Sequence, residues 1–198
     1  RTRAPRVGKY DQIVVLRNIP WQQYDDLCEA RKDSAGPRMA YLDGTLEIMS
    51  PARSVEYEKK LIARLIETYG EETGVSLNGF GSETFREKAE EAGVEPDECY
   101  CVGPAQKYPY FAIEVINKHG DIDKLEIYRR LKVAEDRFWE KGRFSIHRLS
   151  RGRDTQVERS GVLPGLDFDE LTRIVAATDE SHQTEAVRAY RKALHTRG

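Results

Sequence analysis

The chain has 198 residues, a net charge of −2 and a hydrophobic content of 39%. This length fits one domain with a core and argues against two full domains. Sixteen Phe and Tyr side chains exclude wholesale disorder, and an odd count of three cysteines argues against a disulfide scaffold. Because acidic and basic residues nearly balance, a nucleic acid would have to bind a local basic patch.

The sequence lacks the marks of a membrane or secreted protein. No run approaches the roughly 18 apolar residues that cross a bilayer, and residues 1–10 lack the apolar stretch of a secretory signal. We therefore expect a cytoplasmic protein with no membrane partner. We expect one domain over residues 1–198, with a basic extension over about 1–10 and a helical tail over about 179–198.

The chain begins with a strand, a helix and a hairpin. Residues 13–16 form a short apolar run that predicts a strand, and residues 21–28 carry apolar side chains at helical spacing. Asp43-Gly44 separates two β-rich runs over 38–49. This dipeptide is the strongest short-range hairpin signal, because its turn needs two residues at positive φ.

The middle of the chain predicts a long helix and then several strands. Apolar positions over 55–69 mark one side of an amphipathic helix. Residues 75–85 indicate one or two strands broken by glycines, and 94–102 another, with Pro96 near its beginning. Residues 110–116 hold six apolar side chains around one acid, which is typical of a strand buried on both faces.

The last third predicts a helix, a set of strands and a final helix. Asp121 or Asp123 can cap a helix that runs to about Leu131. A further helix starts near Phe168 and carries an apolar stripe. The intervening strands are predicted at 137–139, 144–149 and 156–159.

Glu114 is the residue that most needs an explanation, because a buried carboxylate without a partner is costly. Asp97 precedes it by 17 residues, and Lys124 follows it by ten. Two carboxylates on neighbouring strands can converge on one Mg²⁺ ion, which prefers oxygen ligands. A nearby lysine can orient or deprotonate the attacking water, or stabilise charge on a phosphate. Asp97 could instead belong to a solvated acidic loop, and Lys124 could be an ordinary surface lysine.

Glu56 is a fourth candidate, in the first turn of the helix after Pro51. The positive end of the helix dipole favours a carboxylate there, and Lys59 or Lys60 could pair with it on the surface. Its spacing places it at the border of the apolar face. Glu56 could therefore have a structural role alone or could face a site at the edge of the sheet.

Motifs of other enzyme classes are missing. The sequence contains no GxxxxGK[ST], no GxGxxG that opens a helix and no GxSxG. These absences argue against a nucleotide-binding or an acyl-transfer function. The four histidines show no pair at helical metal-binding spacing, although His119 lies between Glu114 and Lys124.

Five motifs stand out in order along the chain: 41–51 (YLDGTLEIMSP), 81–86 (GSETFR), 93–100 (GVEPDECY), 113–115 (IEV) and 123–128 (DKLEIY). Together they resemble the Uma2 family of restriction-endonuclease-like proteins, over about residues 10–175. The resemblance implies an α/β (α+β mixed) fold of the PD-(D/E)-x-K nuclease type, with a restriction-endonuclease-like core in which a mixed β-sheet is flanked by helices.

The resemblance also implies roles for the four candidates. Asp97 and Glu114 match the two acids that hold Mg²⁺ or Mn²⁺, and Glu56 matches the acid on the helix after the Ser-Pro turn. Ile116 stands where the plain E-x-K form has its lysine, so Lys124 is the expected displaced basic residue, with Lys118 as the alternative.

The leading prediction is a single nuclease-like domain that hydrolyses DNA with a divalent metal. Residues 121–160 hold eleven basic against eight acidic side chains, and residues 83–98 hold seven acidic against two basic, so the charge is segregated. One alternative is a catalytically silent nuclease-fold module that forms a homodimer or binds nucleic acid. Another is a metal-dependent hydrolase of a different phosphate substrate.

Overall fold

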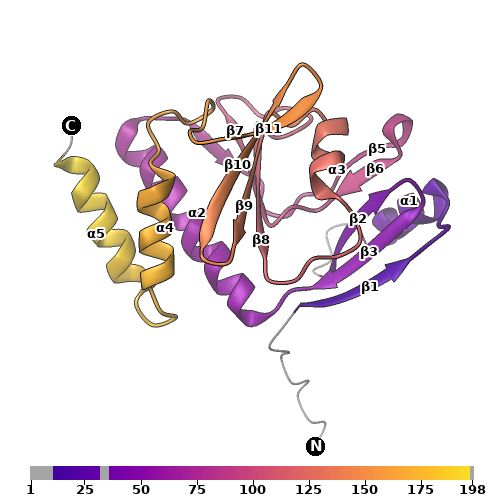
Figure 1. Cartoon of the computed structure of the whole chain (residues 1–198), viewed down its shortest axis with the longest axis horizontal. Helices are drawn as coiled ribbons and strands as arrows, with labels where there is room; N and C mark the ends of the chain where they lie inside the picture. Colours follow the sequence, from indigo (N-terminus) through magenta and orange to yellow (C-terminus); the bar gives the residue numbers. More distant parts are fainter. Residues whose placement is uncertain (1–10, 32–35, 197–198) are drawn as a thin grey trace, which may run out of the picture.

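The computed structural model describes residues 11–31 and 36–196, and the basic extension expected over 1–10 lies outside these described residues. Within them the strands form two sheets (Figure 1). The five-stranded sheet contains, in spatial order, β1 (Gln12–Leu16), β3 (Thr45–Ser50), β2 (Arg38–Leu42), β6 (Ala92–Val94) and β5 (Phe85–Glu87). The six-stranded sheet contains β11 (Arg153–Val157), β10 (Arg143–Ser150), β9 (Glu135–Glu140), β8 (Phe111–Ile116), β7 (Glu98–Val102) and β4 (Leu77–Gly79).

Helices cover both faces of the six-stranded sheet. The long helix α2 runs along one face with α4 and α5 beside it, and α3 lies on the side of the five-stranded sheet (Figure 1). This mixed α/β arrangement confirms the fold class expected from the sequence. The helices are α1 (Trp21–Arg31), α2 (Arg53–Thr73), the 3₁₀ turn η1 (Lys88–Glu90), α3 (Lys124–Arg130), α4 (Phe168–Ala177) and α5 (Gln183–His195).

The predicted hairpin is confirmed as β2 and β3. Leu42 pairs with Thr45, and the two turn residues between them have positive φ, 45° at Asp43 and 81° at Gly44. Both values suit the tight turn that a right-handed twist requires. The hairpin matters for the site because it places Arg38 at the start of β2.

The prediction of one strand over 94–102 is wrong, because the structure divides this stretch between the two sheets. Val94 ends β6, which pairs with β2, whereas Glu98 begins β7, which pairs with β8. Pro96 lies at the break, where its missing N–H cannot join a ladder. The crossing leaves Asp97 directly before β7.

The strand β8 is buried on both faces, as its apolar run predicts. Its neighbour β9 is parallel to it, and α3 forms the crossover between the two strands. Phe111, Ile113 and Val115 belong to the core with α2, whereas Ala112 packs in the cluster that contains α3. Because side chains alternate along a strand, Glu114 shares the α3 face with Ala112.

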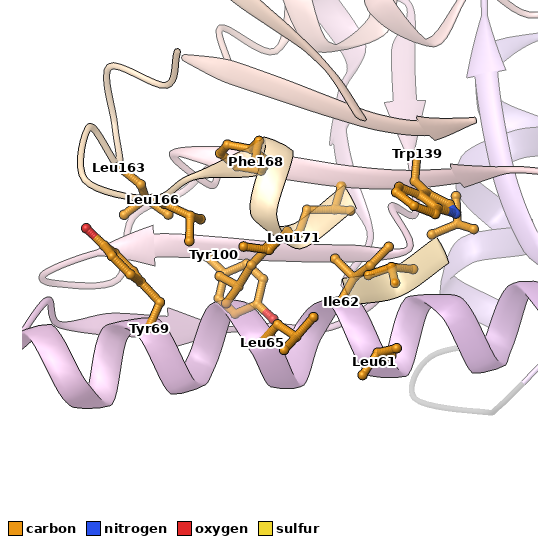
Figure 2. Packing of buried hydrophobic residues seen from close by; sticks show 14 of the residues in the cluster. Leu61, Ile62, Leu65, Tyr69, Tyr100, Trp139, Leu163, Leu166, Phe168 and Leu171 are labelled. Atoms are coloured by element: carbon orange, nitrogen blue, oxygen red, sulfur yellow. The ribbon is translucent and has the colours of Figure 1, made fainter. Parts of the chain in front are cut away.

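The larger core lies between α2 and the six-stranded sheet. In Figure 2, Ile62 and Leu65 of α2 lie near Trp139 of β9 and Tyr100 of β7, whereas Tyr69 points toward Leu163 and Leu166. The helix α2 passes Gly70 and ends at Thr73, where Gly74 takes a left-handed φ of 73°. Burial of this stripe, rather than local helix propensity, accounts for most of the stability of α2.

The expected tail region contains α5, which packs against α2. Val187 and Tyr190 of α5 are buried in the same core as α2 and α4. An ion pair of 2.7 Å between Arg191 and Glu71 also joins α5 to α2. Within residues 11–31 and 36–196, every helix is too short or too polar to cross a membrane.

Gly93 tests how tightly the five-stranded sheet packs on α1. A Cβ at this position would lie 2.2 Å from the Tyr24 hydroxyl and 2.7 Å from its ring. Tyr24 is fully buried and stacks on Tyr41, with ring centres 4.8 Å apart, so it cannot easily move. We expect Gly93→Ala to lower the free energy of unfolding by about 1–3 kcal/mol, the usual cost of overpacking. Urea denaturation measures this, and Gly36→Ala is the control, because its Cβ would make only ordinary contacts. An equal, small loss in both variants would contradict the prediction.

Candidate active site

Glu114 forms the centre of a small polar cluster beneath α3. Its side chain is almost completely buried, and its Oε2 lies 2.6 Å from Lys124 Nζ. Its Oε1 accepts a hydrogen bond from the Tyr128 hydroxyl. Asp123 caps α3, accepting from the Leu125 amide at 3.0 Å, so Lys124 is the first helical residue. Lys124 and Tyr128 are one turn apart and share the face that meets Glu114.

Asp97 lies beside Glu114 on the same face of the sheet. The antiparallel register pairs Glu98 with Ile113, and its continuation by one residue places Asp97 opposite Glu114. Side chains of opposed residues point to the same face. Asp97 is fully buried, and its Oδ2 accepts a hydrogen bond of 2.6 Å from the Val115 amide. The structure therefore brings the two predicted acids together.

Glu56 reaches this cluster through Arg38. The Nη1 atom of Arg38 forms an ion pair with Oδ1 of Asp97, and its Nη2 lies 2.7 Å from Oε1 of Glu56. Lys59 approaches the other oxygen of Glu56 at 2.9 Å. Burial raises the pKa of Glu56, but the hydrogen bond and charge of Lys59, together with Arg38, outweigh it and leave the pKa below its usual value. Glu56 is thus an ionised carboxylate at the rim of the site.

Sequence reasoning missed Arg38 and Tyr128. Arg38 opens the first strand of the hairpin, where an arginine is unremarkable, and only the folded chain brings it to Asp97. Tyr128 lies within the helix that the sequence predicts up to about Leu131, where an aromatic side chain is an ordinary core residue. The signal that could have identified it is its spacing of four residues from Lys124. Burial, followed by the charge of Glu114, raises the pKa of Tyr128 well above its usual value, so the hydroxyl stays a hydrogen-bond donor.

The donor atoms of Asp97 and Glu114 suit a small divalent cation. Mg²⁺ is commonly held by one or two carboxylates and keeps waters or substrate oxygens as its other ligands. Among the described residues, no group of three or more His, Cys, Asp or Glu side chains is arranged to hold a metal ion. The two buried negative charges are compensated here by Arg38 and Lys124.

A cleft of about 290 Å³ is lined by Lys124, the residue that contacts Glu114, but not by Asp97 or Glu114 themselves. Lys118, the alternative basic residue, also lines it, as does His119, which lies between Glu114 and Lys124 in the sequence. His119 is exposed and lies 3.1 Å from Glu140, so its near partner is a carboxylate other than Glu114. Of Lys118, His119 and Lys124, the last is the one that contacts Glu114, at 2.6 Å.

Asp136 of β9 is a buried acid on the same face of the six-stranded sheet as Glu114. Its Oδ1 has no hydrogen-bond partner among the described residues. Burial, followed by the nearby carboxyl of Asp154, raises the pKa of Asp136 well above its usual value. The neutral acid is therefore the form that the folded protein prefers.

This preference predicts a pH-dependent stability. A carboxyl whose pKa is raised by folding stabilises the protein below its unfolded pKa of about 3.9, and the contribution is lost as pH rises through the folded pKa. We expect Asp136→Asn to be more stable than the parent protein at about pH 8, and to lose that advantage near about pH 4. Thermal unfolding across this range measures the difference. Asp169→Asn, which changes an exposed acid, should show no such trend, and a parallel pair of curves for Asp136→Asn and the parent would contradict the prediction.

The fold and the cluster define a class of protein. A mixed sheet flanked by helices, with one buried acid within β8 and another directly before β7, matches a restriction-endonuclease-like fold. The Uma2 family, whose description reads "Putative restriction endonuclease", matches residues 21–180. The chain therefore belongs to the Uma2 family, which confirms the resemblance seen in its five motifs. No curated protein matches the chain.

Proposed function

We propose that this chain is a divalent-metal-dependent endonuclease that hydrolyses phosphodiester bonds in DNA. The observation that carries the proposal is the placement of Asp97 and Glu114 on adjacent chain segments, buried on one face, with Lys124 at 2.6 Å from Glu114. Membership of the Uma2 family supports a nuclease. The excess of basic residues over 121–160 supports a polyanionic substrate.

Each residue of the cluster has a role in this proposal. Asp97 and Glu114 would hold Mg²⁺ or Mn²⁺, and a bound ion supplies Lewis-acid stabilisation of the charge that develops on the phosphate. Lys124 would orient the attacking water or take its proton, and Tyr128 holds the Glu114 carboxylate in place. Glu56, at the rim, would orient water or bind through it.

The test is incubation with plasmid and with single-stranded DNA, in Mg²⁺ or Mn²⁺ against EDTA. Cleavage that requires the metal supports the proposal. A small phosphodiester, added as a third substrate, identifies a hydrolase of another phosphate if it is cleaved while DNA is not. If no substrate is cleaved under any metal condition, the proposal that the chain is an enzyme is wrong.

A specific observation favours one rival, a catalytically silent module. Three of the four oxygens of Asp97 and Glu114 accept hydrogen bonds, from the Val115 amide, Lys124 and Tyr128, and the fourth, Oδ1 of Asp97, has an ion contact with Arg38. A charge-compensated cluster of this kind is stable without a metal. A silent module would bind DNA or form a homodimer without cleaving DNA. The homodimer stays a prediction, and analytical sedimentation can test it.

A further inference from the structure

Arg38 occupies a position that the proposed metal would need. Its guanidinium bridges two carboxylates, the fully buried Asp97 and the rim residue Glu56. The Arg38 side chain is itself 8% exposed, so this ion pair is shielded from water and salt. Arginine suits such a bridge because its planar fork presents several donors at once.

The contacts of Asp97 show why the two cations compete. Oδ2 of Asp97 already accepts the Val115 amide, which leaves Oδ1 as the oxygen best able to bind an ion. Arg38 contacts this oxygen. A doubly charged ion on the same carboxylate would lie close to the guanidinium in a site of low dielectric, where like charges repel strongly. Binding of the ion therefore requires Arg38 to withdraw from Asp97.

Glu56 provides a place for the withdrawn side chain. Its carboxylate is 44% exposed and ionised, and it already contacts Nη2 of Arg38 at 2.7 Å. Arg38 can thus leave Asp97 without losing every partner. The Lys124 contact with Glu114 differs, because that lysine belongs to the proposed chemistry and would remain near the phosphate.

We infer that Arg38 is an internal counter-ion that competes with the divalent cation for Asp97 and so sets the ion concentration at which the acidic pair is loaded. This inference rests on the proposed function, because it assumes that Asp97 and Glu114 form the metal site. It assigns Arg38 an effect on metal affinity that is separate from catalysis. Removal of Arg38 strengthens metal binding, whereas removal of a metal ligand weakens it.

The experiment is calorimetric titration with Mn²⁺ alone, in the absence of DNA. We expect Arg38→Met to bind Mn²⁺ roughly tenfold more tightly or better, the scale on which one neighbouring opposite charge changes the proton affinity of a carboxylate. The matched control is Arg31→Met, which removes an arginine paired with the buried Glu95 at 3.3 Å, outside the cluster. Its affinity should equal that of the parent protein. The added variant Glu114→Gln, alone and with Arg38→Met, shows whether the ion binds at the acidic pair.

The outcomes separate this inference from the proposed function. If Mn²⁺ binding depends on Glu114 but Arg38→Met binds Mn²⁺ no more tightly than the parent protein, the counter-ion role of Arg38 is wrong and the metal site is retained. Absence of Glu114-dependent binding in both the parent and Arg38→Met overturns both. If the methionine variant does not fold, Arg38→Gln replaces it, because its neutral amide removes the positive charge and can still donate a hydrogen bond to Asp97. Arg38→Gln should bind Mn²⁺ more tightly than the parent, and parental affinity in a folded Arg38→Gln overturns the inference.

Discussion

Glu114→Gln is expected to lower metal-dependent DNA cleavage by roughly 10³-fold, because a catalytic metal contributes several kcal/mol and each 1.4 kcal/mol is a factor of ten. Glutamine keeps the size of the side chain and can still accept the hydrogen bond from Tyr128. The neutral amide removes the charge that would hold the ion and that now pairs with Lys124. Calorimetry should show the loss of divalent-ion binding, and circular dichroism an unchanged fold.

The matched control is Glu98→Gln. Glu98 is also a buried acid and lies next to Asp97, but alternation along the strand turns it to the opposite face, toward Lys59 and Lys60 of α2. Burial already raises the pKa of Glu98, so the neutral amide should be tolerated. We expect its cleavage rate and metal affinity to match the parent protein. Equal losses in both variants would mean that a general change of the sheet, and not the loss of a ligand, explains the effect of Glu114→Gln.

Lys124→Ala is expected to lower cleavage by roughly 10²-fold or more without weakening Mg²⁺ binding. The reason is that Lys124 touches Glu114 but supplies no ligand to a cation. Lys124 is the first residue of α3, and its substitution by alanine retains a strong helix former. Single-turnover cleavage at saturating metal measures the chemical step without product release.

Two further lysine variants complete the second test. Lys192→Ala removes an exposed lysine of α5 and should leave cleavage unchanged. Lys118→Ala changes the other lysine that lines the cleft. If Lys124→Ala retains full activity and Lys118→Ala loses it, the basic role belongs to Lys118 and our assignment of this stretch is wrong.

Local patterns in the sequence predicted most of the secondary structure. The apolar run of β8, the Asp43-Gly44 turn and the helical stripe of α2 each report a property of a few neighbouring residues: burial, backbone conformation or periodicity. The same logic identified Glu114, because an acid within a buried strand needs a partner wherever the strand lies. The predicted roles of Asp97 and Lys124 depended mainly on the match of both residues to the Uma2 motifs.

Only the tertiary structure decided which sheet each strand joins and which cations the acids contact. Ala92–Val94 and Glu98–Val102 look like one strand, but they pair with different partners on either side of Pro96. Arg38 reaches Asp97 only because the hairpin and β7 meet through that crossing. Strand pairing and charge compensation depend on contacts between residues far apart in the chain, and these contacts cannot be predicted from local spacing. The sequence by itself therefore determined the elements, the family and the acid at the centre of the site, whereas the fold determined that Arg38, Lys124 and Tyr128 surround the acidic pair.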